Sequence, residues 1–404
     1  MKIGKYIVLA SITVLFFIFQ NFTTADQIKS DSKGTYINVE DFRAVGDGKT
    51  DDTLAIQKAI DFAFANKVQR LVFQKKEYAL ASDNAFNVIA LYGENLILEG
   101  HGATFIKSSK TGGITGDAFI VAGLIPGAQH PHTRETNPHP LVPAKKIVIS
   151  DIKIIIKKKP TNMNCIGIFN VDGLLIKNVT CENAPQTSFA IISDDTHDGK
   201  YIMKAKNIIL DNTHSINSFK HAYRVISFSD NGSKEIEHEL DVTIKNCTSK
   251  GVREAESNEK NKETFGFKIN LWYRPAYNKA KLTVMNCKFD QSGKVVVSGA
   301  KVGSLKLSNN VINGGLFISK GSTKINIEKN KIQCAYSDGS PAIFLKGMQS
   351  ESTFVNNQLF NYNRGCVQDS SIENFEHSPN QVMSRYFEMI HPSSELNDFN
   401  SKSY

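Results

Sequence analysis

Alternating apolar and polar residues mark two segments of the chain, 220–227 and 264–271, that align with each other. In both segments the apolar side chains recur at every second position, which is the periodicity of a β-strand. The alignment pairs Tyr223 with Phe267, Arg224 with Lys268, and Val225 with Ile269. Two cations therefore occupy one position of a repeated strand.

A second pattern, a short apolar strand followed by asparagine, recurs along most of the chain. Its asparagines are Asn178, Asn212, Asn246, Asn286, Asn309 and Asn356, and the first three follow each other at intervals of 34 residues. Recurrence over tens of residues is typical of a solenoid. Asparagine tolerates left-handed backbone, and its amide can hydrogen-bond to the next repeat. We expect these asparagines to line up along one corner.

Further apolar runs lie between these units and are expected to stack as one long parallel sheet. They are residues 118–121, 166–168, 189–192, 295–297, 316–318 and 342–345, together with the two aligned segments. Neighbouring strands are only about 4.8 Å apart. Arg224 and Lys268 would then lie side by side on the outer face, which is unfavourable unless an anion binds between them.

Near the N-terminus, residues 37–52 lead into a predicted helix. Asp51 or Asp52 is expected to cap this helix. Its apolar face is formed by Ile56, Ala59, Ile60, Ala63 and Phe64, which recur at helical spacing.

This stretch resembles the N-terminal signature of the pectate-lyase-like superfamily of right-handed parallel β-helices, N-V-x-D-F-G-A-x-G-D-G-x-T-D-D-T-x-A-I-Q-x-A-I. Arg43 stands where that family usually has glycine. The resemblance implies an all-β fold, a single-stranded right-handed parallel β-helix from residue 36 to 370 with a capping helix over 52–67. We expect roughly nine or ten rungs. Asp47, Asp51 and Asp52 are interpreted as turn and cap residues.

The first 25 residues have the features of a secretory signal peptide. Lys2 and Lys5 precede an apolar run over 7–19, and small residues favour cleavage after Ala25. An uncleaved membrane anchor is the alternative. No other stretch is long and apolar enough to span a membrane. The sequence predicts a secreted or periplasmic protein that is not attached to a membrane after signal cleavage, with a linker at 26–35 and a C-terminal tail at 371–404.

Composition adds two expectations about partners and cysteines. The formal charge of +8 fits either a solvated basic surface or affinity for an acidic polysaccharide. No motif that interleaves aromatic and basic residues is visible, so nucleic acid is not an expected partner. Six cysteines match no zinc pattern. Cys247 and Cys287 occupy equivalent repeat positions, which predicts stacked interior side chains rather than a designed disulfide.

The central repeats also resemble family 28 glycoside hydrolases, which carry N-T-D, G-D-D, G-H-G and R-I-K on consecutive rungs. Residues 220–222 fall at G-H-G, and 266–272 resemble G-V-R-I-K-T-W with Lys268 and Asn270 replacing the basic residues. At the first two motifs the chain has Asn-Met-Asn (162–164) and Pro-Gln-Thr (185–187). The carboxylates of those motifs are therefore absent.

Glycoside hydrolysis normally requires two carboxyl groups. The chain offers Asp194, Asp195, His197 and Asp198 beyond the strand at 189–193. These residues are candidates for replacement carboxylates. Asp194, Asp195 and Asp198 are also candidate ligands for calcium, the one cofactor that we consider. The same run is equally compatible with a polar turn.

Elimination or epimerisation at a uronic acid needs cations that neutralise a carboxylate and a base that reaches the adjacent proton. Arg224, Lys268 and His221 fit these roles, and a neighbouring cation favours the neutral form of Lys268. The candidate substrate-binding residues are Asn164, Asn270, Trp272, Tyr273 and Arg274, and we expect Asn164, Gln186, Thr187, His221, Arg224 and Lys268 to share one groove. Alternatively, the two cations pair with Glu254 or Glu256 at the surface.

Three functions remain open from the sequence. The first is a polysaccharide lyase or epimerase that acts on an acidic glycan. The second is a polygalacturonase-type hydrolase with relocated carboxylates, and the third is a glycan-binding protein without catalysis.

Overall fold

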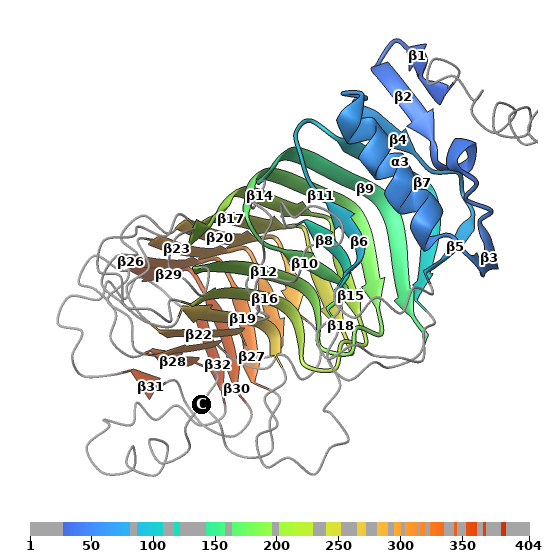
Figure 1. Ribbon diagram of the computed structural model, residues 1–404. Coiled ribbons are helices and arrows are strands. Elements are labelled where there is room, and N and C mark those ends of the chain that lie inside the picture. Colours follow the sequence, from blue (N-terminus) through green and yellow to red (C-terminus); the bar gives the residue numbers. More distant parts are fainter. Residues whose placement is uncertain are drawn as a thin grey trace, which may run out of the picture.

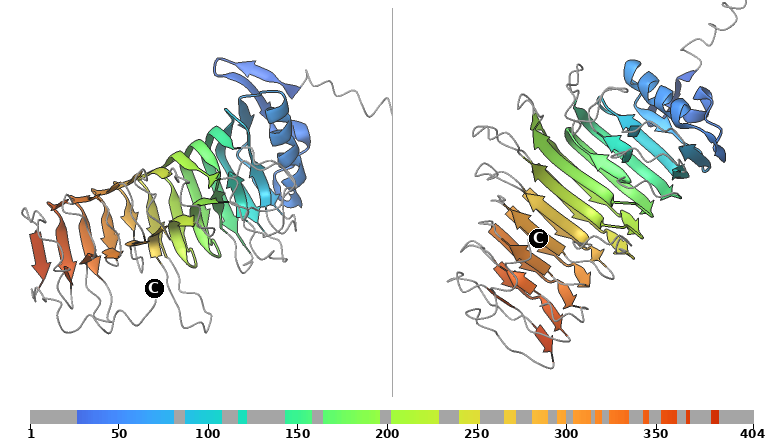
Figure 2. Two further views of the ribbon diagram at one scale, coloured as in Figure 1. Left: turned by 60° about the vertical axis from the view of Figure 1, so that its left-hand side comes forward. Right: turned by 60° about the horizontal axis from the view of Figure 1, so that its bottom comes forward.

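The computed structural model describes residues 27–80, 87–107, 117–121, 143–157, 164–195, 202–228, 240–251, 265–271, 281–289, 295–299, 304–313, 316–319, 324–334, 343–345, 353–361, 367–368 and 381–384. In this part of the chain, short strands wind into an elongated solenoid whose rungs stack from the N-terminal to the C-terminal end (Figure 1). A typical rung contributes a strand to each of three faces. Figure 2 shows the stack from two further sides.

The first and second faces belong to one continuous sheet. The first face contains β2 (Gly34–Asn38), β4 (Arg70–Val72), β7 (Ile97–Lys107), β9 (Ala144–Ile156), β11 (Val171–Glu182), β14 (Ala205–Asp211), β17 (Leu240–Lys245), β20 (Lys281–Met285), β23 (Ser304–Ser308), β26 (Lys324–Glu328) and β29 (Thr353–Val355). The second face contains β3 (Asp47–Asp51), β5 (Glu77–Leu80), the distal halves of β7, β9 and β11, and then β15 (His214–Ile216), β18 (Thr248–Lys250), β21 (Lys288–Phe289), β24 (Val311–Asn313), β27 (Lys331–Cys334), β30 (Gln358–Asn361) and β32 (Gln381–Ser384). Consecutive strands on each face pair in parallel.

The third face is the sheet that the apolar runs predict. It contains β6 (Asn87–Leu91), β8 (Asp117–Val121), β10 (Ile166–Ile168), β12 (Thr187–Asp195), β16 (His221–Phe228), β19 (Phe265–Leu271), β22 (Val295–Gly299), β25 (Leu316–Ser319), β28 (Ile343–Leu345) and β31 (Val367–Gln368). These ten strands follow one another in chain order, and the short β13 (Ile202–Met203) lies off this path, paired antiparallel with β12. The first face has eleven strands in the described part of the chain, one more than the upper end of the nine or ten rungs that we expected.

The asparagines line up along the corner between the first and second faces, as predicted. Asn178, Asn212, Asn246 and Asn286 all have left-handed backbone, with φ between 53° and 57°. The amide of Asn212 donates to Asn178 Oδ1 at 2.8 Å, and that of Asn286 donates to Asn246 Oδ1 at 3.4 Å. The amide of Asn246 donates instead to Asp211 Oδ1 at 2.8 Å. The corner is thus stabilised both by its residue type and by bonds between rungs.

Replacing Asn212 by alanine should destabilise the protein by about 2 kcal/mol. Alanine in left-handed backbone costs roughly 1–2 kcal/mol, and the bond to Asn178 contributes about 1 kcal/mol. Thermal or urea unfolding measures the change. Asn212→Gly is the matched control, because glycine adopts this backbone freely and loses only the hydrogen bond. If both variants destabilise the protein equally, the left-handed backbone at position 212 does not contribute to the effect of alanine.

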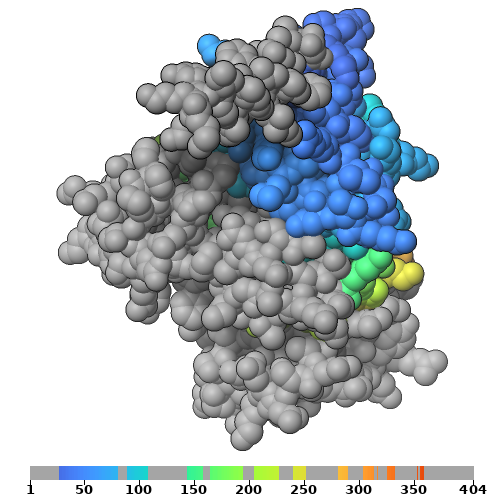
Figure 3. Space-filling model, turned by 45° about the vertical axis from the view of Figure 1, so that its right-hand side comes forward, coloured from blue at the N-terminus to red at the C-terminus, as the bar shows by residue number. Residues whose placement is uncertain are grey.

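The N-terminal end of the solenoid is covered by the capping helix α3 (Thr53–Ala65), within the predicted range. Figure 3 shows this end of the molecule in blue. Asp51, rather than Asp52, accepts a hydrogen bond from the Thr53 backbone N–H at 3.0 Å. Asp52 makes no side-chain cap bond to the helix. It accepts from the backbone N–H groups of Val45 and Gly46 instead, at 2.6 and 3.1 Å. Burial nevertheless raises the pKa of Asp52.

An antiparallel hairpin precedes the helix within the stretch that we expected to be a linker. Strand β1 (Lys29–Asp31) pairs with β2, and a 3-10 turn, η1 (Val39–Phe42), follows. Arg70 holds this hairpin to the first rungs, since its guanidinium donates to Asp31 at 2.6 Å and to Glu99 at 2.9 Å. The hydrogen bond from Arg70 lowers the pKa of Glu99.

Strand pairing also continues past residue 370, where we expected the solenoid to end, because β32 pairs in parallel with β30. Inside the solenoid Cys247 and Cys287 are buried free thiols, with the Cys247 N–H 3.4 Å from Cys287 Sγ. This confirms the predicted stacking. The predicted signal sequence lies outside the described residues. None of the helices in the described ranges is long and apolar enough to cross a membrane.

Candidate functional site

The third face brings Arg224 and Lys268 together as predicted. In the parallel ladder between β16 and β19, Arg224 pairs with Lys268, Tyr223 with Phe267, and Val225 with Ile269. This is the register that the aligned segments predicted. Adjacent strands are about 4.8 Å apart, so two cationic residues occupy neighbouring positions at the middle of this face. Their register partners further along the sheet are Ala190 and Val296.

An aromatic stack beneath Arg224 anchors its strand from inside the solenoid. The Tyr223 ring is fully buried and stacks on Phe189, with 5.2 Å between centroids and planes 7° apart. Its hydroxyl lies 2.8 Å from the Thr213 carbonyl and 3.0 Å from the Thr248 carbonyl, both on the second face. Burial, followed by the nearby Cys247, raises the pKa of Tyr223 well above its usual value, so the hydroxyl remains a donor.

Arg224 itself is half-buried within an apolar surrounding. Its register neighbour Ala190 is 1% exposed, and Ile192 and Ile226 are 7% and 3% exposed. Along β12 and β16 these three residues alternate with the core residues Ile191 and Val225, so they lie on the same side of the sheet as Arg224. A cation in a poorly hydrated position gains more from an approaching anion than a fully solvated one does.

The other expected groove residues lie at the start of the strands rather than beside Arg224. His221 is 4% exposed and pairs in register with the fully buried Thr187. The backbone N–H of Cys165, next to Asn164, donates to the Thr187 carbonyl at 2.8 Å. The Gln186 carbonyl accepts from the His221 N–H at 3.0 Å. Because three residues of strand span about 10 Å, His221 is farther than Lys268 from Arg224.

Comparisons with known proteins identify the architecture. No protein-family model matches the chain, and no curated protein matches its sequence. Among solved structures, the A-module of mannuronan C-5 epimerase AlgE6 from Azotobacter vinelandii is similar, with TM-score 0.56 and 14% identity over 88% of this chain and 95% of that one. PfbA, a surface adhesin of Streptococcus pneumoniae, has TM-score 0.53 and 16% identity over 86% and 88% of the two chains.

A third similar structure is the tailspike protein of Escherichia coli bacteriophage HK620, with TM-score 0.55 and 10% identity over 88% of this chain and 64% of the tailspike. All three are right-handed parallel β-helices. This chain is a right-handed parallel β-helix. The predicted fold class is therefore confirmed. An epimerase, an adhesin and a tailspike differ in function, so the shared β-helix does not by itself identify a reaction.

The remaining candidate residues of the β-helix are only partly described. Asp194 and Asp195 end β12, where they pair with Met203 and Ile202 of β13. Asn270 lies in register with Ile226, two positions beyond Lys268. Asp198, Trp272, Tyr273 and Arg274 lie outside the described residues, as do Glu254 and Glu256. Within the described ranges no group of three or more His, Cys, Asp or Glu residues is arranged to hold a metal ion.

The sequence contained a signal for the buried apolar residues next to Arg224, which the motif comparison did not use. The run Phe189-Ala190-Ile191-Ile192 is continuously apolar, a pattern typical of strands buried on both faces. The structure confirms this burial for all four residues. Ala190 and Ile192, which lie on the same face as Arg224, are therefore buried as well as the two core residues.

Proposed function

We propose that this β-helix acts on an acidic polysaccharide outside the cytoplasm, as a lyase or epimerase, and that Arg224 and Lys268 form the reactive pair. The observation that carries the proposal is the parallel register, which places the two cations on adjacent strands. Arg224 lies in an apolar surrounding there. Two neighbouring cations in such a place are most stable when a carboxylate lies between them.

The proposed chemistry begins at the carbon next to the uronate carboxylate. Lys268, as base, takes the proton from C5, and the electron pair left on C5 delocalises into the carboxylate. Arg224 neutralises the charge that develops on the carboxylate oxygens. If the bond from C4 to the glycosidic oxygen then breaks, a C4–C5 double bond forms, and the oxygen takes up the proton that the Lys268 ammonium gives back, directly or through water. If water instead protonates the opposite face of C5, the resulting hydroxide takes the proton from Lys268 and the product is the epimer.

The structural comparison supports this choice of substrate class. The epimerase with TM-score 0.56 is named for action at C5 of mannuronan, and this chain covers 95% of it. A hydrolase has less support from the described residues. The register positions next to the cationic pair are Gly167, Ala190 and Val296, and none of these residues has a carboxyl group.

Incubation of the purified protein with alginate, polygalacturonate and hyaluronan should yield either an unsaturated uronide or an epimer with one of these polymers. Ultraviolet absorbance detects the unsaturated product, and NMR in D2O detects deuterium that epimerisation introduces at C5. Parallel reactions with calcium and with a chelator test the calcium hypothesis. New reducing ends without unsaturation would favour the hydrolase, and binding without any product would favour a non-catalytic binding protein.

A further inference from the structure

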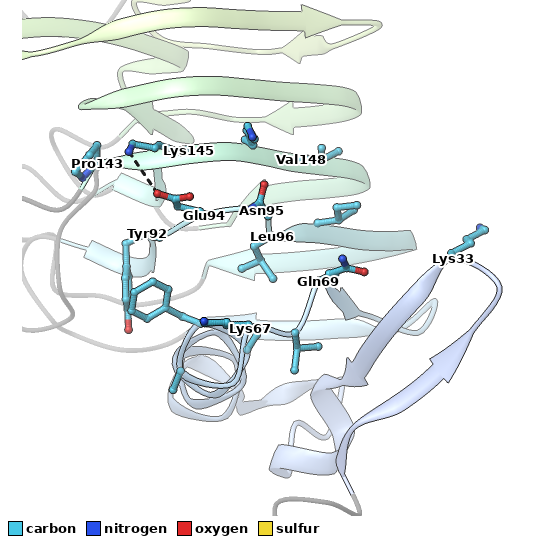
Figure 4. A pocket seen from close by; sticks show the side chains of 17 residues that line it. Lys33, Lys67, Gln69, Tyr92, Glu94, Asn95, Leu96, Pro143, Lys145 and Val148 are labelled. Carbon is cyan, nitrogen blue, oxygen red and sulfur yellow. Dashed lines mark hydrogen bonds and ion pairs between the residues drawn. The ribbon is translucent and has the colours of Figure 1, made fainter.

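A second concave surface, which we call the cap cleft, lies at the N-terminal end of the β-helix. It has a volume of about 1110 Å³ and lies between the C-terminal end of α3, the tip of the β1–β2 hairpin and the chain entering β7 and β9. In Figure 4, Tyr92 and Glu94 lie at one end of the cleft, Lys33 of the hairpin tip lies at the other, and Gln69 lies between them. Its volume is slightly above the usual range of about 300–1000 Å³ for a small-ligand pocket.

Positive charge dominates the cap cleft. Its charged lining residues are Lys33, Lys67, Lys145, Lys146 and Glu94, a net charge of +3. Lys145 pairs with Glu94 at 3.3 Å. In the part of the chain that the structure describes, neither Lys67 nor Lys146 forms an ion pair, and both are exposed. The cleft therefore has cations that an incoming anion can neutralise.

Two of these lysines have an unusual backbone conformation for their residue type. Lys67 and Lys146 have φ of 54° and 51°, in the left-handed region. Asn95 and Asn207 have the same conformation at 60° and 52°, in nearby turns of the solenoid. Asparagine is the residue type that tolerates this region best after glycine. Lysine is thus present at the rim of the cleft at a conformational cost, as it also is at Lys329 elsewhere in the solenoid.

The cap cleft also offers the contacts that a sugar ring uses. Phe64 is 44% exposed and packs edge-on against Tyr92, with ring centroids 4.9 Å apart. Gln69 and Asn95 present exposed amides, which both donate and accept hydrogen bonds. An exposed aromatic ring packs against the apolar face of a sugar, amides bind its hydroxyls, and lysines bind its carboxylates.

We propose that the cap cleft is a second binding site that takes an acidic oligosaccharide, separate from the Arg224–Lys268 pair. The net charge of +3 at the cleft is complementary to a polyanion. A second copy of this chain is a poorer occupant, because the protein carries a formal charge of +8 and like charges repel. The proposal rests on the cleft alone, and it holds whether or not the third face is catalytic.

The test measures the affinity of tetragalacturonate by calorimetry in an Arg224→Ala, Lys268→Ala background, so that the cap cleft is the remaining proposed site. Lys67→Asn with Lys146→Asn should weaken binding about tenfold, since two partly solvated ion pairs contribute up to about 1 kcal/mol each. Asparagine preserves the left-handed backbone at both positions. Neutral maltotetraose should not bind measurably.

The matched control is Lys329→Asn with Lys58→Gln, which removes the same charge outside the cleft. Lys329 has φ of 56°, so it reproduces the change in a left-handed lysine. This variant should retain the parent affinity. Equal loss in both double variants, no binding by the parent, or tighter binding of a single-stranded oligonucleotide than of tetragalacturonate would overturn the proposal. Loss of turnover on Arg224→Ala, Lys268→Ala with cleft binding intact separates this site from the catalytic proposal.

Discussion

Replacing Lys268 by alanine should lower turnover of the acidic polysaccharide by a factor of about 100 or more, the low end for a general base. The register places Lys268 beside Arg224, where it is the nearest candidate base. Steady-state kinetics on the polymer identified by the activity screen measures the effect. Lys306→Ala is a control, because Lys306 is a half-exposed strand lysine on the first face that pairs with Glu328 at 2.7 Å.

Lys268→Arg separates the two roles that this position combines. Arginine retains the positive charge but does not lose its proton in proteins. The variant should therefore keep KM close to that of the parent while kcat falls as far as in Lys268→Ala. Arg224→Ala should lower kcat and raise KM, because it removes a contact to the substrate carboxylate in both the ground and transition states.

The opposite pattern would favour a hydrolase. If Asp194→Asn or Asp195→Asn abolishes turnover while Lys268→Ala leaves it nearly intact, the relocated carboxylates become the better account. Circular dichroism of each variant must match that of the parent, so that loss of the fold is not mistaken for loss of catalysis.

Replacing Tyr223 by alanine should destabilise the protein by about 3–5 kcal/mol, as expected for a large buried aromatic side chain. Tyr223 is fully buried, stacks on Phe189 and contacts Phe289 edge-on, with 6.0 Å between centroids. Its removal leaves a cavity between the third and second faces. Urea unfolding at neutral pH measures the change.

Tyr223→Phe is the matched variant, since it retains the ring and removes only the hydroxyl that bonds to the Thr213 carbonyl. It should cost about 1 kcal/mol, the usual contribution of one such hydrogen bond. Turnover by Tyr223→Phe should equal that of the parent below its melting temperature. A change of less than about 1 kcal/mol in Tyr223→Ala would show that the ring does not hold the two faces together.

The sequence by itself determined the repeat, the corner and the register of the cationic pair. Alternation with period 2 is a local property, and parallel strands from successive rungs stack in register. Two aligned segments therefore predict which residues become neighbours, as Arg224 and Lys268 do. The corner was equally predictable, because asparagine tolerates left-handed backbone and its amide bridges rungs.

Only the tertiary structure decided features that depend on packing between segments. Strict alternation would place Ser188 on the same face as Ala190, yet its hydroxyl bonds to Ser215 and Ser218 inside the solenoid, at 2.8 and 2.7 Å. Burying three hydroxyls together satisfies each of them, and this outweighs the strand period. Asp52 likewise bonds to the loop before the helix, rather than capping it, because the first turn of the solenoid folds back over it.

The cap cleft is the clearest case of a feature that sequence analysis could not reveal. Lys33, Lys67 and Lys146 are far apart in the chain and belong to the hairpin tip, the end of the capping helix and the start of β9. No periodicity relates them, so their sequence neighbourhoods contain no sign that they line one cleft. They line one cleft because the hairpin, held by Arg70, and the helix both pack against the same end of the β-helix. Local sequence patterns determine which residues repeat along the solenoid. The packing of the non-repeating hairpin and helix determines which surfaces form at its N-terminal end.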